Sequence, residues 1–140
     1  MQKKIVIDTN VLVSAILSAV SNPGKIFYEF IFTKRSFLCI SAEIFQEYVE
    51  VCNRDKFKRF PFFEYRANLF LIYILNFSNN YEPNQHFDLL KDKSDNKFID
   101  LAFEANAHYI ITGNTKDFKI SKHKKTLIVT PKEFLKLQLN

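Results

Sequence analysis

The chain has 140 residues, a length that suits one domain spanning residues 1–140 with a core that needs no disulfide or metal to stabilise it. Hydrophobic residues make up 47% and charged residues 25%, which are ordinary fractions for a soluble globular protein. The formal net charge of +5 favours a polyanionic partner, although a solvated lysine-rich surface would give the same balance.

The two cysteines and the apolar segments bear on cellular location. Cys39 and Cys52 lie in apolar stretches and are too far apart for a CxxC motif, so we expect buried, reduced thiols and a cytoplasmic protein. The apolar run 5–7 leads directly into Asp8 and is too short for a signal peptide. The longest apolar cluster, 68–77, is too short to span a bilayer, so no membrane association is expected.

Short apolar runs alternate with segments whose apolar residues recur at helical spacing. In the first half they predict a strand at 4–7, a helix at 10–18, a helix from Ser21 to about 33, a strand at 37–40, a helix capped by Ser41 and a longer helix at 61–77. A turn or short strand at 77–83 and a connection at 87–93 follow. The second half continues with a helix at 95–106, a strand at 109–112, a last strand at 127–129 and a C-terminal helix opened by Thr130 and Pro131. This alternation predicts the α/β class, with a parallel sheet covered on both faces.

Several acidic and amide residues occupy sequence positions that such a sheet would bring to one edge. Sites in open α/β sheets form outside the carboxyl ends of the strands. Asp8 follows the first strand, Asn114 and Asp117 follow the strand at 109–112, and Asp95 opens the helix that leads into it. Glu47 is flanked by apolar residues at 44, 45, 48 and 51, so it should lie at the border of the buried helix face, able to point over the sheet edge.

Each of these residues also has a plain structural interpretation. Asp8 would serve equally well as a helix N-cap, and Glu47 with Glu43 and Glu50 as a solvated helix face. Asp92 and Asp95 suit caps or loop solvation as well as metal binding, and Asp100, one turn further, reads as surface. Gly113 would allow a tight turn or a positive φ after its strand.

Other chemistries lack their motifs. The histidines have no zinc-binding spacing, and neither a nucleophile elbow nor a glycine-rich phosphate loop is present. Aspartyl phosphotransferases usually carry a second Asp two positions after the first, where this chain has Asn10. Carboxylates alone suit Mg²⁺ or Mn²⁺, which prefer oxygen ligands.

Two basic segments could attract a phosphate backbone through salt-sensitive contacts. The first follows the Glu47 helix and the second lies near the C-terminus: Arg54, Lys56, Lys58 and Arg59, then Lys122, Lys124 and Lys125. A solvated charge run explains either segment equally well.

Several motifs together resemble a known family. IVIDTNVLVS at 5–14 looks like the opening of a PIN domain. FLCIS at 37–41, the helix through Glu47 and NRDKF at 53–57 resemble its second block. DKSDNKF at 92–98 and AHYIITGN at 107–114 resemble the third and fourth. The order is that of the family over almost the whole chain, and the nearest subgroup is the VapC-like toxins of bacterial toxin–antitoxin pairs.

This resemblance implies a three-layer α/β/α fold with a central parallel sheet of four to five strands, and a Mg²⁺- or Mn²⁺-dependent ribonuclease. The family's metal-binding acids correspond here to Asp8, Glu47 and Asp95. Asn114 stands where the family has a fourth acid and is a neutral, weaker ligand. The supporting residues are expected to be Asn10, Asp92, Thr112 and Asp117. A cognate antitoxin and a homodimer are implied by the resemblance alone.

The leading hypothesis is therefore an endoribonuclease that acts as a toxin on RNA. One alternative is a PIN-fold RNA-binding module that has lost catalysis through Asn114. Another is a PIN nuclease that acts on DNA or in RNA maturation. A Rossmann-like nucleotide-binding protein is disfavoured because no phosphate loop is present.

Overall fold

The computed structural model describes residues 2–113 and 122–139. Its strands are β1 (Lys3–Ile7), β2 (Ser36–Ile40), β3 (Asn79–Asn80), β4 (Tyr109–Ile111), β5 (Lys122–His123) and β6 (Thr126–Val129). Its α-helices are α1 (Thr9–Leu17), α2 (Asn22–Ile26), α3 (Ala42–Cys52), α4 (Phe63–Phe77), α5 (Asn96–Ala105) and α6 (Pro131–Leu137). Short helical turns occupy Phe27–Ile31, Asp55–Phe57 and Lys93–Asp95.

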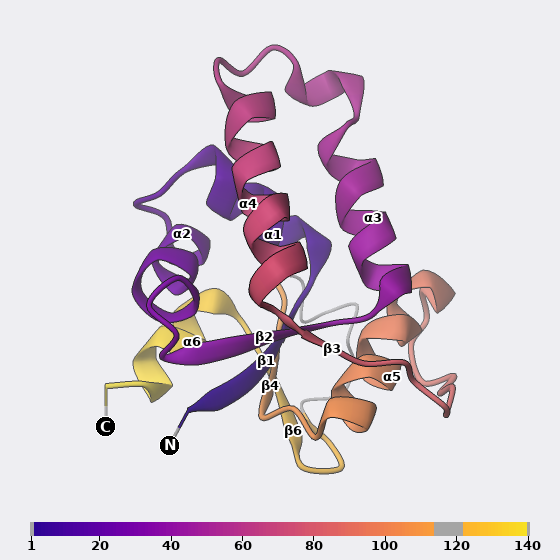
Figure 1. Ribbon diagram of the computed structural model, residues 1–140. Helices are drawn as coiled ribbons and strands as arrows, with labels where there is room; N and C mark the ends of the chain where they lie inside the picture. The colour runs from indigo at the N-terminus through magenta and orange to yellow at the C-terminus, as the bar shows by residue number, and fades with distance from the viewer. Residues whose placement is uncertain (1, 114–121, 140) are drawn as a thin grey trace.

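The strands form one sheet in the order β3-β2-β1-β4-β6-β5. Every pairing is parallel except that of β5 with β6. Helices α1, α3 and α4 contact one another on one face of this sheet, and α5 packs against β1, β2 and β4 on the other (Figure 1). The predicted three-layer α/β/α architecture is therefore confirmed.

The centre of the sheet is fully apolar because both of its faces are covered. Ile5, Val6 and Ile7 of β1 and Ile110 of β4 have no exposed surface. The two cysteines are buried and unpaired, as expected from their apolar surroundings. This rigid centre fixes the positions at which the polar residues after β1 and β4 emerge.

The predicted helix starts are largely confirmed by their caps. The Ser41 hydroxyl accepts a hydrogen bond from the Ile44 backbone N–H at 3.2 Å, and the Ser21 hydroxyl accepts one from Gly24 at 3.1 Å. Thr130 and Glu133 form a reciprocal capping box at the start of α6. The local sequence therefore determines where each helix begins. In α3 the Ser41 cap thereby fixes the direction in which Glu47 points.

Three features of the fold differ from the prediction: the start of α4, the form of the helix after Ser21 and the number of strands. Helix α4 begins at Phe63 rather than Pro61, because Phe62 takes a left-handed conformation with φ 64°. The helix expected to run from Ser21 changes to a wider π-helical turn at Phe27–Ile31. The described residues form six strands rather than four to five, because the two-residue strands β3 and β5 pair at the edges of the sheet.

Helix α4 is covered on only one side, although its apolar sequence led us to expect more extensive burial. Phe70, Leu71 and Ile74 are buried, whereas a second face remains exposed. The exposed apolar face of α4, as it is called below, consists of Tyr65, Leu69 and Ile72, which are 65%, 51% and 59% exposed. Their spacing of four and three residues places them in one row on the helix.

No single helix among the described residues is long and apolar enough to cross a membrane; α1 with the helical segment 22–31 reaches that length and composition only as a pair bent by 94°.

The two glycines give a matched test of packing. A Cβ at Gly24 would lie 2.3 Å from the Ser18 backbone oxygen, whereas one at Gly113 meets no atom of the described chain within 4 Å. Gly113 also has no positive φ, contrary to one interpretation of its sequence. We expect Gly24→Ala to lower the free energy of unfolding by roughly 1–3 kcal/mol. Gly113→Ala should change it little; equal losses in urea denaturation would contradict this packing.

Candidate active site

Asp8 follows β1 at the carboxyl edge of the sheet. Its backbone N–H donates to the Ile111 carbonyl at 3.0 Å, which extends the pairing of β1 with β4. Asp8 is the N-cap residue of α1, yet its side chain makes no capping hydrogen bond. The Thr112 hydroxyl instead donates to Asp8 Oδ2 at 2.9 Å. Asp8 is buried, and its carboxylate is held both by Thr112 at the neighbouring strand end and by the backbone of Thr9.

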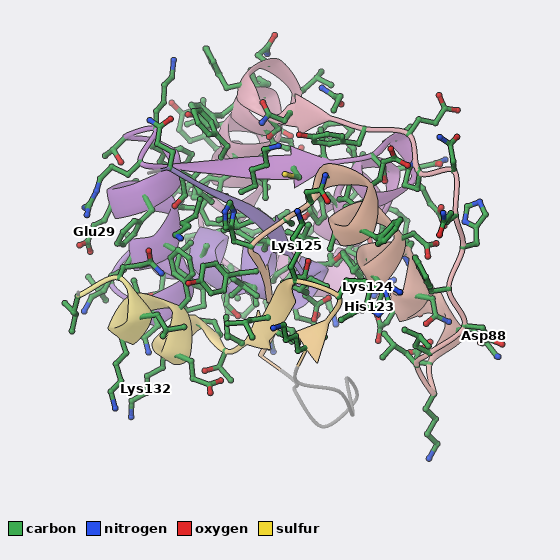
Figure 2. The ribbon with its side chains drawn as sticks, turned by 90° about the horizontal axis from the view of Figure 1, so that it is seen from below. Glu29, Asp88, His123, Lys124, Lys125 and Lys132 are labelled. Atoms are coloured by element: carbon green, nitrogen blue, oxygen red, sulfur yellow. The ribbon has the colours of Figure 1, made fainter. Side chains whose placement is uncertain are left out.

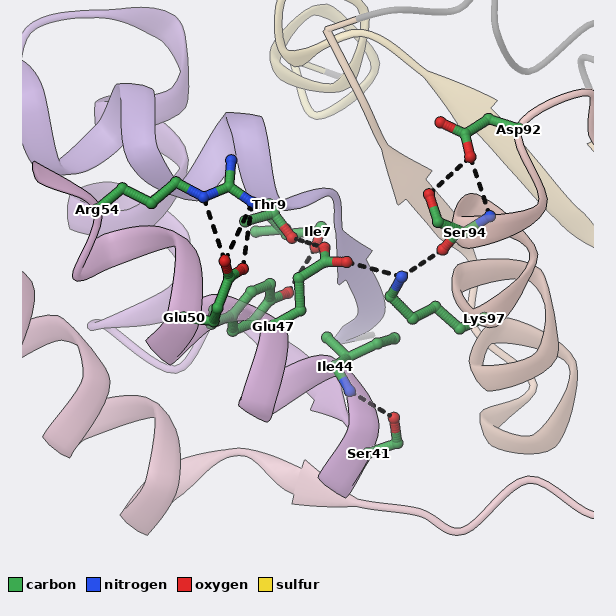
Figure 3. A network of polar contacts seen from close by, with 11 residues as sticks. Ile7, Thr9, Ser41, Ile44, Glu47, Glu50, Arg54, Asp92, Ser94 and Lys97 are labelled. Atoms are coloured by element: carbon green, nitrogen blue, oxygen red, sulfur yellow. Dashed lines mark hydrogen bonds and ion pairs between the residues drawn. The ribbon is translucent and has the colours of Figure 1, made fainter. Parts of the chain in front are cut away.

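Glu47 reaches the same edge from α3. The next residue, Tyr48, is fully buried, and its hydroxyl donates to the Ile7 carbonyl at the end of β1. This bond ties α3 to the strand that carries Asp8. The Glu47 carboxylate accepts a hydrogen bond from the Thr9 hydroxyl (Figure 3).

Lys97 holds the other oxygen of Glu47. Its ammonium nitrogen lies 2.7 Å from Glu47 Oε1 and also donates to the Ser94 carbonyl (Figure 3). The side chains of Lys97 and Glu47 are only 12% and 27% exposed. A partly buried ion pair of this kind links α5 to α3 across the sheet edge and offsets the charge of Glu47.

Asp95 and Asp92 belong to the turn that precedes α5. Asp95 is the N-cap residue of α5 but, like Asp8, makes no capping hydrogen bond. Asp92 is exposed and accepts two hydrogen bonds from Ser94, from the backbone N–H at 3.0 Å and from the hydroxyl at 2.7 Å. Asp92 therefore shapes the turn, whereas the Asp95 carboxylate makes no hydrogen bond within the described part of the chain.

The carboxylates act on one another through their charges. Burial raises the pKa of the Asp8 carboxyl, and the Glu47 charge adds to this effect, whereas the Thr112 hydrogen bond opposes it. Burial, followed by the charge of Asp8, raises the pKa of Asp95 to about 6. Lys97 lowers the pKa of both aspartates. Asp8, Glu47 and Asp95 thus lie close enough to repel one another.

Other residues expected at the site have varied positions. Asn10 is exposed on α1, and Thr112 is buried against Asp8. Asn114 and Asp117 lie outside the described residues. The basic residues 54–59 lie where the α3–α4 hairpin turns, away from the sheet (Figure 1). Lys124 and Lys125 lie at the turn between β5 and β6 (Figure 2).

Asp100 corrects the sequence interpretation. It was expected on the surface, but it is 7% exposed. Its Oδ1 accepts the Phe87 backbone N–H at 2.7 Å, and its Oδ2 lies 3.1 Å from His86 Nδ1. The carboxylate is buried because the connection before α5 packs along that helix, an arrangement that helical spacing alone does not show.

The donor set suits a small divalent ion held by few protein ligands. No three acidic, His or Cys side chains among the described residues are arranged to hold a metal together. Mg²⁺ needs no such cage, because it keeps several waters and is usually held by one or two carboxylates. Asp8 and Asp95 provide two carboxylates without capping bonds, while Glu47 is engaged by Lys97 and Thr9.

The chain matches known proteins over most of its length. Residues 4–116 match the family model of the PIN domain. The chain belongs to the PIN domain family. It is also similar to MJ1680, an uncharacterised protein of Methanocaldococcus jannaschii, with 34% identity over 140 aligned residues that cover 94% of this chain and 89% of that protein. PIN domains are in general nucleases, so the carboxylate cluster lies in a nuclease fold.

Sequence reasoning missed three contributors to this PIN site: the hydroxyls of Thr9 and Tyr48, and Lys97. Tyr48 was predicted as a core residue, but its hydrogen bond to the end of β1 was not foreseen. Lys97 follows Asp95 and Asn96 in the third motif, which is the one signal that could have selected it. Without a structure, a lysine at the start of a helix is read as a solvated side chain.

The shifted pKa of Asp95 gives a pH prediction. A carboxyl with a pKa of about 6 loses its charge as the pH falls through that value, so Mn²⁺ binding should weaken below about pH 6. Asp8→Asn should lower the pKa of Asp95 by removing a repelling charge, and Lys97→Met should raise it by removing an attracting one. Carboxyl-carbon NMR titrations of the metal-free protein measure both shifts. Titration of Asp95 near pH 4 in all three proteins would contradict the prediction.

Proposed function

We propose that this chain is a Mg²⁺- or Mn²⁺-dependent endoribonuclease. The observation that carries the proposal is the placement of Asp8 and Asp95 at one edge of the sheet, both at helix N-caps and neither engaged in capping. Their like charges act on each other there, a repulsion that a bound cation would relieve. The family supports the nuclease class.

In this proposal Asp8 and Asp95 hold the ion. Thr112 orients Asp8, and Lys97 and Thr9 keep Glu47 beside the pair, where it assists binding or orients the attacking water. A bound divalent ion would lower the pKa of a water and offset charge on the phosphodiester. Asn114, and Asp117 through a water, complete the proposed site from the segment after β4.

The basic residues after α3 support a nucleic-acid substrate, and the family favours RNA. Arg54 pairs with Glu50 at 3.2 Å and Lys58 with Asp55 at 3.0 Å, so part of their charge is already offset. Lys56 and Arg59 lie over the rings of Phe57 and Phe60, at 5.2 and 4.8 Å from the ring centroids. All four residues are exposed, and we propose that they contact phosphates along the strand.

Loss of one carboxylate tests the nuclease. We expect Asp8→Asn to reduce Mn²⁺-dependent cleavage of single-stranded RNA by about a hundredfold or more, because even indirect support of a metal ligand is worth ten- to a hundredfold. Asp88→Asn is the matched control, since Asp88 is an exposed aspartate that pairs with Lys93 (Figure 2). Unchanged cleavage in Asp8→Asn would refute the residue assignment.

Calorimetry separates the nuclease from a PIN-fold module that only binds RNA. A nuclease should bind Mn²⁺ through Asp8, with the heat lost in Asp8→Asn. RNA binding without any Mn²⁺ binding by the wild-type protein would favour the binding module. The same purified protein, given DNA and RNA of one sequence, shows which nucleic acid it cleaves.

We further propose that the nuclease is a VapC-like toxin in the cytoplasm, paired with an antitoxin and forming a homodimer. The sequence resemblance supports this role, and the exposed apolar face of α4 supports a protein partner. Expression should arrest bacterial growth, whereas Asp8→Asn should not. Co-expression of a small neighbouring gene should restore growth. Equal toxicity of both forms would exclude nuclease action as the cause.

A further inference from the structure

A cleft of about 700 Å³ lies beside the carboxylate cluster. Its walls are the start of α3, parts of the segment 80–86 and the α5 residues Lys97 and Asp100. Lys97 also binds Glu47, so the cleft and the cluster share this side chain. A nucleic-acid strand with one phosphodiester at Asp8 and Asp95 would therefore have a neighbouring nucleotide within reach of the cleft.

The outer wall of the cleft is held in place by one face of α5. Asn96, Asp100 and Glu104 are spaced four residues apart and so share a helix face. Their side-chain oxygens accept backbone N–H groups from the segment before the helix: Asn96 from Leu89 at 3.2 Å and Leu90 at 2.9 Å, Asp100 from Phe87 at 2.7 Å, and Glu104 from Asn84 at 3.1 Å. These bonds fix a segment that has no regular secondary structure of its own.

Two ring side chains in the cleft are positioned separately, Tyr81 by the end of β2 and His86 by Asp100 of α5. The Tyr81 backbone N–H donates to the Ile40 carbonyl at 2.9 Å, which continues the pairing of β3 with β2 and leaves the residue half-buried. His86 is 74% exposed, but its Nδ1 is held by the buried Asp100. An ionised carboxylate only accepts, so Nδ1 donates and Nε2 is left for a ligand.

The polar groups of the cleft suit a nucleobase better than a phosphate. Glu43 and Glu82 are exposed carboxylates on its walls, and Lys97 is already paired with Glu47. An anionic phosphate would be repelled by the two glutamates. The Lys4 ammonium lies 5.9 Å from the centroid of the Tyr81 ring, so the flat face of an unpaired base would stack on His86, and the carboxylates can accept its N–H groups.

Among the bases, guanine fits this chemistry best, because the Watson–Crick edges of adenine and cytosine each place a ring-nitrogen acceptor next to their one amino donor. Its Watson–Crick edge has two adjacent nitrogen donors that one carboxylate can accept together, whereas uracil has a single N–H between two carbonyl oxygens. Those oxygens would face the glutamates without a donor. We propose that the cleft binds an unpaired guanine of the RNA strand next to the scissile phosphodiester, an inference that rests on the proposed ribonuclease.

The test uses nucleotide binding without divalent ions, so it does not depend on cleavage. Amide NMR spectra of the full chain are recorded with GMP, UMP and ribose 5-phosphate. GMP should shift the amides of Ala42, Glu43, Tyr81 and Glu82, with weaker shifts from UMP and none from ribose 5-phosphate. The double variant Glu43→Gln/Glu82→Gln should weaken GMP binding about tenfold or more.

Glu29→Gln is the matched control, because Glu29 is exposed and lies on the opposite side of the molecule from Asp88 in the segment before α5 (Figure 2). Equal binding of GMP and UMP, or the same shifts with ribose 5-phosphate, would overturn the guanine assignment, as would an unaffected double variant. GMP selectivity in a chain that cleaves no RNA would refute the nuclease and leave the cleft's ligand standing. Cleavage of RNA without GMP selectivity would support the nuclease and refute the guanine assignment.

Discussion

The site depends on the central position of β1. Because β1 pairs with β2 on one side and β4 on the other, its last residue reaches an edge where both neighbouring strands also end. The Asp8 N–H closes onto Ile111 of β4, and the Tyr48 hydroxyl of α3 closes onto Ile7 of β1. These two bonds, one between backbone groups and one from the Tyr48 side chain, bring Asp8 and Glu47, which lie 39 residues apart along the chain, to one edge of the sheet.

This backbone arrangement brings together acidic side chains whose charges repel one another. Asp8, Glu47 and Asp95 repel one another, and burial makes their charges harder to stabilise. At two helix N-caps the carboxylates forgo the capping bonds that such positions favour. Lys97 offsets part of the charge on one side. A fold that keeps several acids together at some cost to stability is typical of a functional site.

The sequence predicts those features of the fold that depend on neighbouring residues, such as helix caps and strand ends. The Ser41 cap sets the register of α3, and the strand ends set the positions of Asp8 and Asp95. The layers and these positions can therefore be predicted from a single sequence. The role of Asp100 could not be predicted, because a carboxylate on a helix is buried only when a distant segment supplies N–H groups to it. Lys97 and the exposed face of α4 depend in the same way on which elements meet, and periodicity does not contain that information.

Lys97 belongs to both the carboxylate cluster and the cleft. A cation at Asp8 and Asp95 would act on its ammonium by repulsion, and a base in the cleft would change its contacts with Glu47 and with solvent. Because both proposed ligands would act on the same ion pair, each would alter the affinity for the other, and linkage requires the two factors to be equal. In the proposed nuclease, the ion pair between Lys97 and Glu47 would therefore link base recognition to metal binding.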